Sequence, residues 1–239
     1  MRREVTPDVV RHIATSPNGE GTLIFSRLRE ANAEEIIRQQ VDYFESIGQG
    51  FEWKVYDYDK PHDLKERLAS FGFTVEEGEA LMVIDLDDAP EILWQPVRHH
   101  VQRIIDPEKL ADVQSIEDQV WNEDSSRLIH YLGDSLSNHP EQLSVYVAYV
   151  DEKPASAAWV YFPQHSQFAS LWGGSTIHEY RQQGLYTSLL EVRAQEAKAR
   201  QVRYLTVDAS VMSRPILEKF GFEMLAYSYP YRWKIKSPK

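Results

Sequence analysis

Cysteine is absent from all 239 residues of the chain. Its absence excludes disulfide bridges, thiolate nucleophiles and cysteine-ligated zinc, and it fits a cytoplasmic location. The chain also lacks any run of the ~20 apolar residues that a membrane helix requires, and its N-terminus lacks the apolar centre of a signal peptide. Eight histidines are present, but no two of them form an HExxH pair. We therefore expect no membrane segment and no metal site.

Basic side chains are in deficit, with 26 Lys and Arg against 37 Asp and Glu, for a formal net charge of −11. Because a nucleic-acid binder usually presents a basic face, we expect no nucleic-acid partner. An acidic surface favours a cationic or amine-bearing partner through long-range steering, although such a charge also simply keeps a protein in solution. The 42% hydrophobic content is enough for one or two cores.

The first half alternates strands with helices. Asn32 and Glu35 have the spacing of a capping box, which predicts that a helix begins after Asn32. Apolar periodicity predicts the other elements: strands at 21–28, 51–55 and 79–86, and a short helix at 62–71. The segment 88–96 has a proline near each end and is predicted to be a linker.

The second half predicts an α/β sheet of mixed strand direction rather than a regular Rossmann alternation. Asp106-Pro107 is a helix start, because the carboxylate can cap and proline suits the first turn. The remaining elements are strands at 101–105, 143–150, 155–162, 168–177, 204–208 and 223–235, and helices at 126–138, 184–200 and 212–220. We expect two domains, 1–90 and 97–239.

A weak internal repeat relates the two halves. Residues 68–73 read LASFGF and residues 217–222 read LEKFGF. Each hexapeptide follows a strand and a short helix, and each precedes a strand-rich tail. Glycine after a short helix is common helix-stop chemistry, so coincidence is one explanation. The shared order of the flanking elements favours duplication.

The segment 171–190, LWGGSTIHEYRQQGLYTSLL, runs from a strand through a polar loop into a helix. Gly184 stands where the backbone must turn tightly or approach a ligand. The amide N–H groups of such a loop, with those of the first helical turn, make a socket for an anion. Arg181 adds a permanent positive charge. A diphosphate is the natural occupant.

On these residues the second half resembles the GNAT superfamily of acyl-CoA N-acyltransferases. That family has the pattern Arg/Gln-x-x-Gly-x-Gly/Ala at its pyrophosphate loop, which Arg181 and Gly184 match. Tyr186 departs from the small last residue, and its side chain either narrows the socket or points aside. The segment 215–222, PILEKFGF, is a second match. The first half resembles the same fold, but its acidic 29–35 stretch has no glycine loop. The resemblance thus implies a tandem GNAT fold with a degenerate N-terminal half and one cofactor site.

The resemblance also implies which residues bind the cofactor, acetyl-CoA. They are Ser175, Thr176, Ile177, Arg181, Gln182, Gln183, Gly184, Leu185, Tyr186 and Thr187. A strand N–H near Ile177 or Gly174 would polarise the thioester carbonyl. Gly173 and Gly174 either form a bulge that opens a slot for the thioester or only relieve crowding beside Trp172.

Catalytic residues are not identified by the sequence. Many relatives place a tyrosine on the last short helix, as the acid that protonates the leaving thiolate, but the corresponding residue here is Leu217. Weak candidates for a replacement are Asp208, Ser210, Tyr227 and Tyr229. Asp208 is better explained by capping the next turn than by catalysis, and the two tyrosines by a place in the core or at the rim of the pocket.

We therefore expect an N-acetyltransferase that uses acetyl-CoA to acetylate a primary amine of a small molecule, an amino acid or a peptide. The alternative is a non-catalytic acyl-CoA-binding sensor or partner module, which the missing tyrosine favours. Acyl chain preference and transfer to oxygen are left open. The acceptor and the oligomeric state, a homodimer included, do not follow from the sequence.

Overall fold

A computed structural model describes residues 1–15 and 19–235. Contacts divide the chain into two compact units, Met1–Leu81 with Met224–Lys239, and Met82–Glu223. The last segment of the chain thus groups with the first unit, which the expected boundaries of 90 and 97 did not include. No helix among the described residues is both long enough and apolar enough to span a bilayer.

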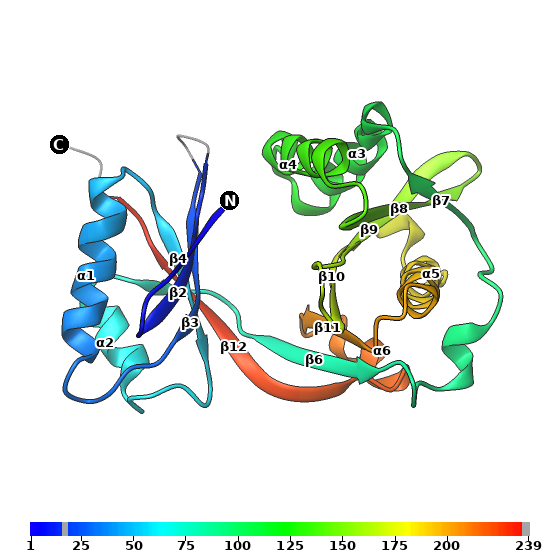
Figure 1. The fold of residues 1–239 in the computed structure, drawn as a ribbon. Coiled ribbons are helices and arrows are strands. Elements are labelled where there is room, and N and C mark those ends of the chain that lie inside the picture. The colour runs from blue at the N-terminus through cyan, green and yellow to red at the C-terminus, as the bar shows by residue number, and fades with distance from the viewer. Residues whose placement is uncertain (16–18, 236–239) are drawn as a thin grey trace. The chain divides into compact units, whose positions relative to one another are not determined.

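The first unit is a sheet covered by two helices, α1 and α2 (Figure 1). Its strand order is β1-β2-β3-β4-β12, and β5 pairs with β12. The strands are β1 Arg2–Val5, β2 Val9–Ile13, β3 Gly21–Ser26, β4 Phe51–Tyr56, β5 Thr74–Val75 and β12 Glu223–Trp233, and the helices are α1 Ala33–Ser46 and α2 Leu64–Ser70. Phe51, Trp53 and Val55 point into the core, as their alternation predicted.

The expected capping box at the start of α1 does not form. The Asn32 side chain makes no cap bond to the helix. Its Oδ1 instead accepts from the Arg29 amide at 2.8 Å, and its Nδ2 donates to Asp8 at 3.3 Å. Glu35 reaches forward to the Gln39 amide group at 2.8 Å rather than back to the cap. The Asn32 side chain therefore fixes the loop before α1 instead of capping the helix.

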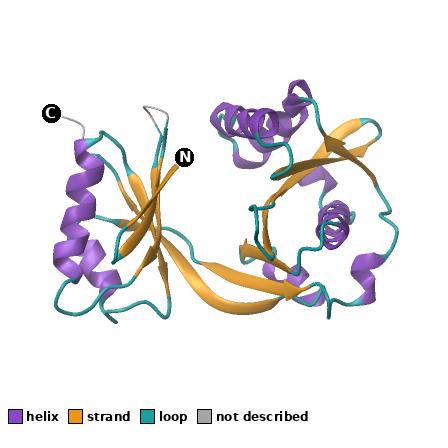
Figure 2. Ribbon diagram, in the orientation of Figure 1, coloured by secondary structure: helices purple, strands orange, loops and turns teal. Residues whose placement is uncertain are grey.

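The second unit has the strand order β6-β11-β10-β9-β8-β7 (Figures 1 and 2). The strands are β6 Glu79–Asp85, β7 His100–Ile104, β8 Leu143–Val150, β9 Lys153–Tyr161, β10 Phe168–Thr176 and β11 Tyr204–Ala209. The helices are α3 Leu110–Trp121, α4 Ser126–Asn138, α5 Leu185–Ala199 and α6 Arg214–Lys219. Short 3-10 helices cover Glu91–Trp94, Pro107–Lys109 and His178–Tyr180. Helices α3 and α4 pack together with β8, β9 and β10 around one core.

The segment 88–96 is packed rather than a free linker. Leu93 within it is fully buried. The Gln195 side chain on α5 donates to the carbonyls of Leu93 and Gln95 at 3.0 and 2.8 Å. This segment therefore lies within the second unit, fastened along α5.

The two LxxFGF segments adopt the same turn in their separate units. In each, the last phenylalanine donates its amide to the leucine carbonyl, at 3.2 Å from Phe73 to Leu68 and at 3.1 Å from Phe222 to Leu217. The glycines have φ angles of +88° and +86°. Each turn follows a β-α-β segment whose two strands are parallel, β3 with β4 and β10 with β11. The repeat in the sequence is a repeat in structure.

Candidate functional site

The candidate site lies where β10 and β11 part. The two strands begin as a parallel pair, with Phe168 opposite Tyr204 and Ser170 opposite Thr206. Beyond these residues the pairing stops, although β10 continues to Thr176 and β11 to Ala209. Backbone groups on the facing edges are therefore not used by each other. Such an opening at the carboxyl ends of parallel strands is a common place for a ligand.

A bulge in β10 stands at this opening. Gly173 pairs with Ala158 of β9 and Ser175 pairs with Ala157, so the register passes over Gly174. Gly174 has a φ of +87°, a conformation that a side chain disfavours. Beyond the bulge, Ile177 donates its amide to Ala155 at 3.0 Å. That bond corrects one expectation, because the Ile177 N–H is already engaged and Gly174 is the better placed of the two to polarise a carbonyl.

The loop from β10 to α5 has the backbone shape of an anion socket. Gln182 and Gly184 both have left-handed backbones, with φ of +62° and +88°. The first bond of α5 runs from the Ser188 amide to the Gly184 carbonyl at 3.0 Å, so the three amides between these residues have no partner within the helix. Arg181 donates from Nε to the Thr176 carbonyl at 3.1 Å, which fastens its charged group beside the loop. The helix dipole adds to this positive potential.

The Tyr186 side chain points toward the bulge in β10. A Cβ placed on Gly174 would stand 2.7 Å from Tyr186 Cε2, so the ring lies directly on the glycine. Burial raises the pKa of the Tyr186 hydroxyl, which therefore stays protonated at neutral pH. The Tyr186 ring therefore borders the bulge in β10, and its effect on the diphosphate socket stays a prediction.

A buried arginine supports the bulge from behind. Arg193 on α5 is 2% exposed. Its Nη1 donates to the carbonyls of Trp159 and Trp172, both at 3.2 Å, and its Nε donates to the Leu189 carbonyl at 2.8 Å. Burial lowers the pKa of Arg193 to about 10, which still leaves the guanidinium charged at neutral pH. The arginine thus bonds α5 to the two strands that form the bulge.

A buried carboxylate beside Ser175 was not singled out from the sequence. Glu117 on α3 is 4% exposed, and burial raises the pKa of its carboxyl. The Trp121 indole donates to Glu117 Oε2 at 3.0 Å and to Ser175 Oγ at 3.2 Å. The sequence did hold a signal, because Glu117 interrupts the apolar face on which Val113 and Val120 lie.

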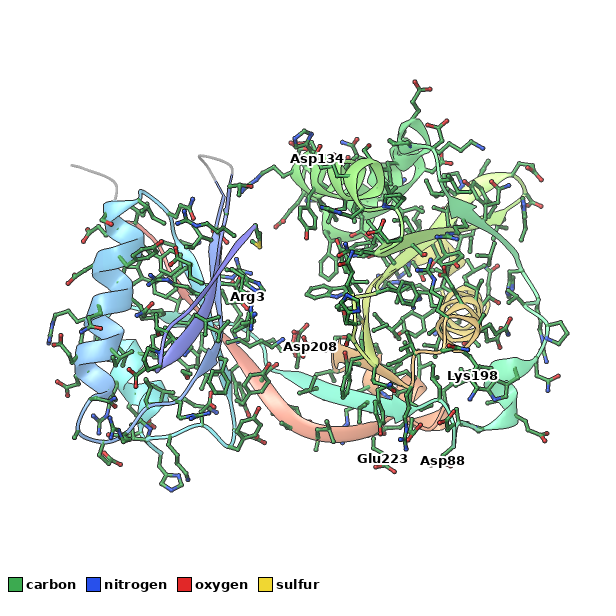
Figure 3. All side chains as sticks on the ribbon, in the orientation of Figure 1. Arg3, Asp88, Asp134, Lys198, Asp208 and Glu223 are labelled. Atoms are coloured by element: carbon green, nitrogen blue, oxygen red, sulfur yellow. The ribbon has the colours of Figure 1, made fainter. Side chains whose placement is uncertain are left out.

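The candidate catalytic residues are divided between the units. Asp208 is half-buried in β11 of the second unit (Figure 3). Ser210 lies two residues after Asp208, and the Ser210 Oγ accepts a hydrogen bond from the Ser213 amide at 3.3 Å, at the start of α6. Tyr229 belongs to β12 in the first unit, where the Lys65 ammonium lies 3.4 Å from its ring centroid. Tyr227 precedes it on the same strand. Their catalytic roles stay predictions, and Leu217 is fully buried in α6.

The corresponding strand pair in the first unit carries a side-chain hydrogen bond. Strands β3 and β4 also pair in parallel over three residues, from Gly21 opposite Phe51 to Leu23 opposite Trp53. The Trp53 ring, fully buried, then donates from its indole nitrogen to Ser26 Oγ across the two strands at 3.3 Å. This strand pair is therefore linked by side chains as well as by its backbone.

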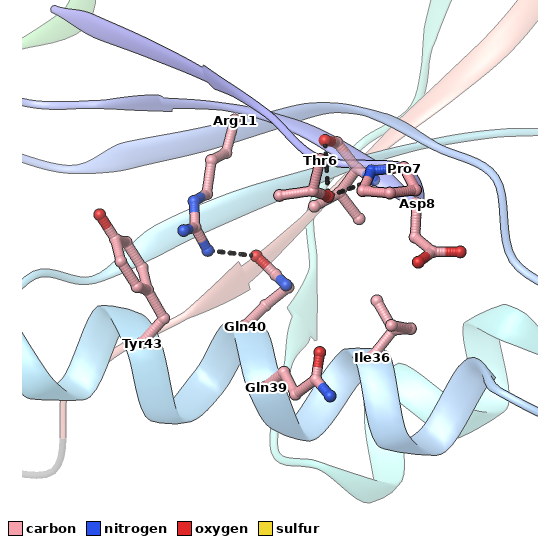
Figure 4. Close-up of a pocket in the computed structure, with 9 residues that line it drawn as sticks. Thr6, Pro7, Asp8, Arg11, Ile36, Gln39, Gln40 and Tyr43 are labelled. Atoms are coloured by element: carbon pink, nitrogen blue, oxygen red, sulfur yellow. Dashed lines mark hydrogen bonds between the residues drawn. The ribbon is translucent and has the colours of Figure 1, made fainter.

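A separate cavity of about 360 Å³ lies in the first unit, between α1 and the turn from β1 to β2 (Figure 4). The Arg11 guanidinium there donates to Gln40 at 2.8 Å and to Glu4 at 2.9 Å, and it lies 3.4 Å from the Tyr43 ring centroid. The Arg11 side chain in this cavity is thus already held by its neighbours. Across residues 1–15 and 19–235, no three His, Asp or Glu side chains gather to hold a metal ion.

The parted strands, the bulge and the glycine loop all lie within a region that matches a family model. Residues 104–222 match the model of the acetyltransferase (GNAT) family. The chain therefore carries a domain that belongs to the acetyltransferase (GNAT) family. No curated protein matches the chain.

Solved structures extend the likeness to nearly the whole chain. A functionally unknown conserved protein from Staphylococcus epidermidis ATCC 12228 superposes with a TM-score of 0.75 at 13% identity, over 98% of this chain and 93% of that one. A GCN5-related N-acetyltransferase from Kribbella flavida gives 0.71 at 15% identity, over 97% and 88%. A tandem GNAT protein from the clavulanic acid biosynthesis pathway gives 0.65 at 12%, over 97% and 80%. More particularly, then, the fold is that of tandem GNAT proteins.

Proposed function

We propose that this protein transfers an acetyl group from acetyl-CoA to a primary amine of a small molecule, an amino acid or a peptide, in the cytoplasm. The observation that carries the proposal is the parting of β10 and β11 after Ser170 and Thr206, directly before the bulge. The thioester would enter this opening beside Gly174. The pantetheine arm would run along residues 175–177, like an added strand.

The diphosphate of the cofactor would bind at residues 181–187. Three helical amides and the Arg181 guanidinium converge there, and an anion at a helix N-terminus is favoured by both hydrogen bonding and the dipole. His99 lies against this turn, because its Cε1 would be 3.2 Å from a Cβ on Gly184. Any side chain at Gly184 would therefore meet His99 or the ligand.

The reaction itself is a direct attack of the amine on the thioester. Holding the two reactants in line supplies much of the rate, with effective molarities of about 10⁵–10⁸ M for well-oriented groups. The amine must first lose its ammonium proton, since an alkylammonium has a pKa near ~10.4. The chain therefore needs a proton acceptor near the bulge.

The decisive experiment is a calorimetric titration of CoA into the protein and its Gly184→Glu variant. Gly48→Glu is the matched control, because Gly48 has a φ of +69° and open space around it. We expect Gly184→Glu to lose at least about 100-fold in affinity, roughly 2.7 kcal/mol, through like-charge repulsion and the occupied turn. The control should bind as the wild type does. Equal affinity of all three proteins would refute the site.

A second candidate function is a non-catalytic acyl-CoA sensor. It is favoured because Leu217, fully buried in α6, stands at the position where many relatives have the acid tyrosine. Thiol release from acetyl-CoA over a panel of primary amines separates the two functions. Tight CoA binding without amine-dependent thiol release would identify the sensor.

A further inference from the structure

Glu117 is a buried carboxylate without a cation. In the described part of the chain, the charged group that acts on it is Asp118, which has the same sign. Asp118 is itself held by the Ser125 amide and hydroxyl at 2.8 and 2.6 Å. Glu117 Oε1 is buried and accepts no hydrogen bond from any residue that the structure describes. A buried charge with an unused oxygen is costly, so its presence calls for a reason beyond stability.

A second glutamate of the same unit shows what a structural carboxylate looks like. Glu196 on α5 accepts from Ser144 and Tyr146 at 2.8 and 2.7 Å and forms an ion pair with Arg200 at 2.7 Å. Its charge is fully used within the protein. Glu117 has neither the cation nor a bond at its second oxygen.

The Trp121 indole marks the place of an N–H donor beside the bulge. Its single N–H points between Glu117 Oε2 and Ser175 Oγ, at 3.0 and 3.2 Å. Trp121 is the last residue of α3, and 65% of it is exposed. The next residue, Asn122, ends the helix with a φ of +53°. An exposed side chain at a helix end can turn away without disturbing a core.

We propose that Glu117 and Ser175 hold the ammonium of the acceptor in the place where the Trp121 indole N–H lies, and that Glu117 takes its proton. The proposal rests on the proposed function and adds the proton acceptor to it. Ser175 directly follows Gly174 on β10, so an amine bonded to its hydroxyl lies next to the bulge that would carry the thioester.

The ammonium transfers one proton to the Glu117 carboxylate and becomes a neutral amine. Its lone pair forms the new C–N bond, the C–S bond breaks, and CoA leaves as a thiolate. The nitrogen of the new amide then loses its extra proton. This proton is transferred to the thiolate, which becomes the thiol. Burial strengthens Glu117 as a base by raising the pKa of its carboxyl.

The test compares three variants with the wild type: Glu117→Gln, Trp121→Phe and Glu191→Gln. Glu191 is the matched control, because it is also buried with an unpaired Oε2 but lies on α5 and faces Arg98. Each protein is titrated with CoA by calorimetry. Each is then assayed for acetyl transfer to a primary alkylamine and to an arylamine, and titrated with the alkylamine at saturating CoA.

We expect Glu117→Gln to keep the CoA affinity and lose about 10²–10⁴ in kcat with the alkylamine, the usual size of a general-base contribution. The loss should be much smaller with the arylamine, which is already neutral at pH 7. Trp121→Phe removes the competing N–H, so it should lower KM for the alkylamine without lowering kcat. Glu191→Gln should match the wild type in both constants.

Three results would overturn the assignment. Full alkylamine turnover by Glu117→Gln is one, and an equal loss with both classes of amine is another. The third is alkylamine binding at saturating CoA that is absent in the wild type or unchanged in Glu117→Gln. Failure of the wild type to bind CoA would instead remove the proposed function, so the two failures are distinguishable.

Discussion

Replacement of Gly174 by alanine tests the geometry of the bulge. The new methyl group would have to occupy a φ of +87° and would stand 2.7 Å from Tyr186 Cε2. The backbone conformation costs about 1–2 kcal/mol for a residue with a side chain. Forcing the tyrosine ring away adds about 1–3 kcal/mol of overpacking. We therefore expect Gly174→Ala to destabilise the protein by about 2–5 kcal/mol.

Two comparisons separate the backbone cost from the clash. Gly72→Ala has nearly the same φ, +88°, and nothing within 4 Å, so it should cost only the backbone part. In a Tyr186→Ala background, Gly174→Ala should also cost only that part, which gives a coupling energy of about 1–3 kcal/mol.

The assay is unfolding by denaturant. The slope of the unfolding free energy against denaturant concentration is compared among the variants, because a changed slope would indicate a changed unfolded state. Where the two units unfold in separate steps, each variant is compared on the step of its own unit. A coupling energy within about 0.5 kcal/mol of zero would mean that the ring does not lie on the glycine, and the described opening would be wrong.

Three further outcomes are expected. Arg193→Met should destabilise the second unit by about 2–4 kcal/mol, seen as a lower denaturation midpoint, because the hydrogen bonds that its guanidinium donates to three carbonyls are lost; an unchanged midpoint would contradict its role. Burial raises the pKa of the Glu117 carboxyl above 4.5, so the protonated carboxyl stabilises the folded protein fully below pH 4.5, and this stabilisation is lost as pH rises through the native pKa. The wild type should therefore become less stable relative to Glu117→Gln between pH 4.5 and neutrality. Parallel melting curves of the two proteins across that range would argue against burial of the charge. Trp53→Ala should destabilise the first unit by about 3–5 kcal/mol and leave CoA affinity unchanged, as measured by calorimetry; weaker binding would place a ligand in the first unit.

Periodicity located most elements because their apolar faces are regular. The helix expected at 126–138 is α4, and the strand expected at 143–150 is β8, each with the same bounds. Helix α5 differs by one residue at each end from 184–200. The mixed sheet and the GNAT fold, confirmed by the family model and the solved structures, followed from this order of elements together with two short motifs.

The first hairpin was not predicted from the sequence, because charged side chains interrupt the apolar pattern of its strands. Strands β1 and β2 read RREV and VVRHI, with too many charges for an apolar alternation. Across the hairpin, Glu4 on β1 forms an ion pair with Arg11 on β2 at 2.8 Å, and along its own strand it forms a second one with Arg2 at 2.9 Å. Such pairs depend on the register between strands, which a single sequence does not display.

The site divides in the same way. The loop at 181–187 is local in sequence, so its glycine and arginine could be read directly. Glu117 and Ser175 are 58 positions apart and meet only because α3 packs on β10. No local pattern brings a helix carboxylate to a strand hydroxyl, and the tertiary fold alone makes the pair.

The return of β12 to the first unit has a consequence for synthesis. Tyr231 and Trp233 belong to the first core, and they pair with Trp53 and Phe51 on β4. That core therefore stays unfinished until Tyr231 and Trp233 have been synthesised and have left the ribosome. The second unit is continuous from 82 to 223, so it can fold before the first unit has received its last strand. Truncation after residue 223 would thus damage the N-terminal half, far from the cut in sequence.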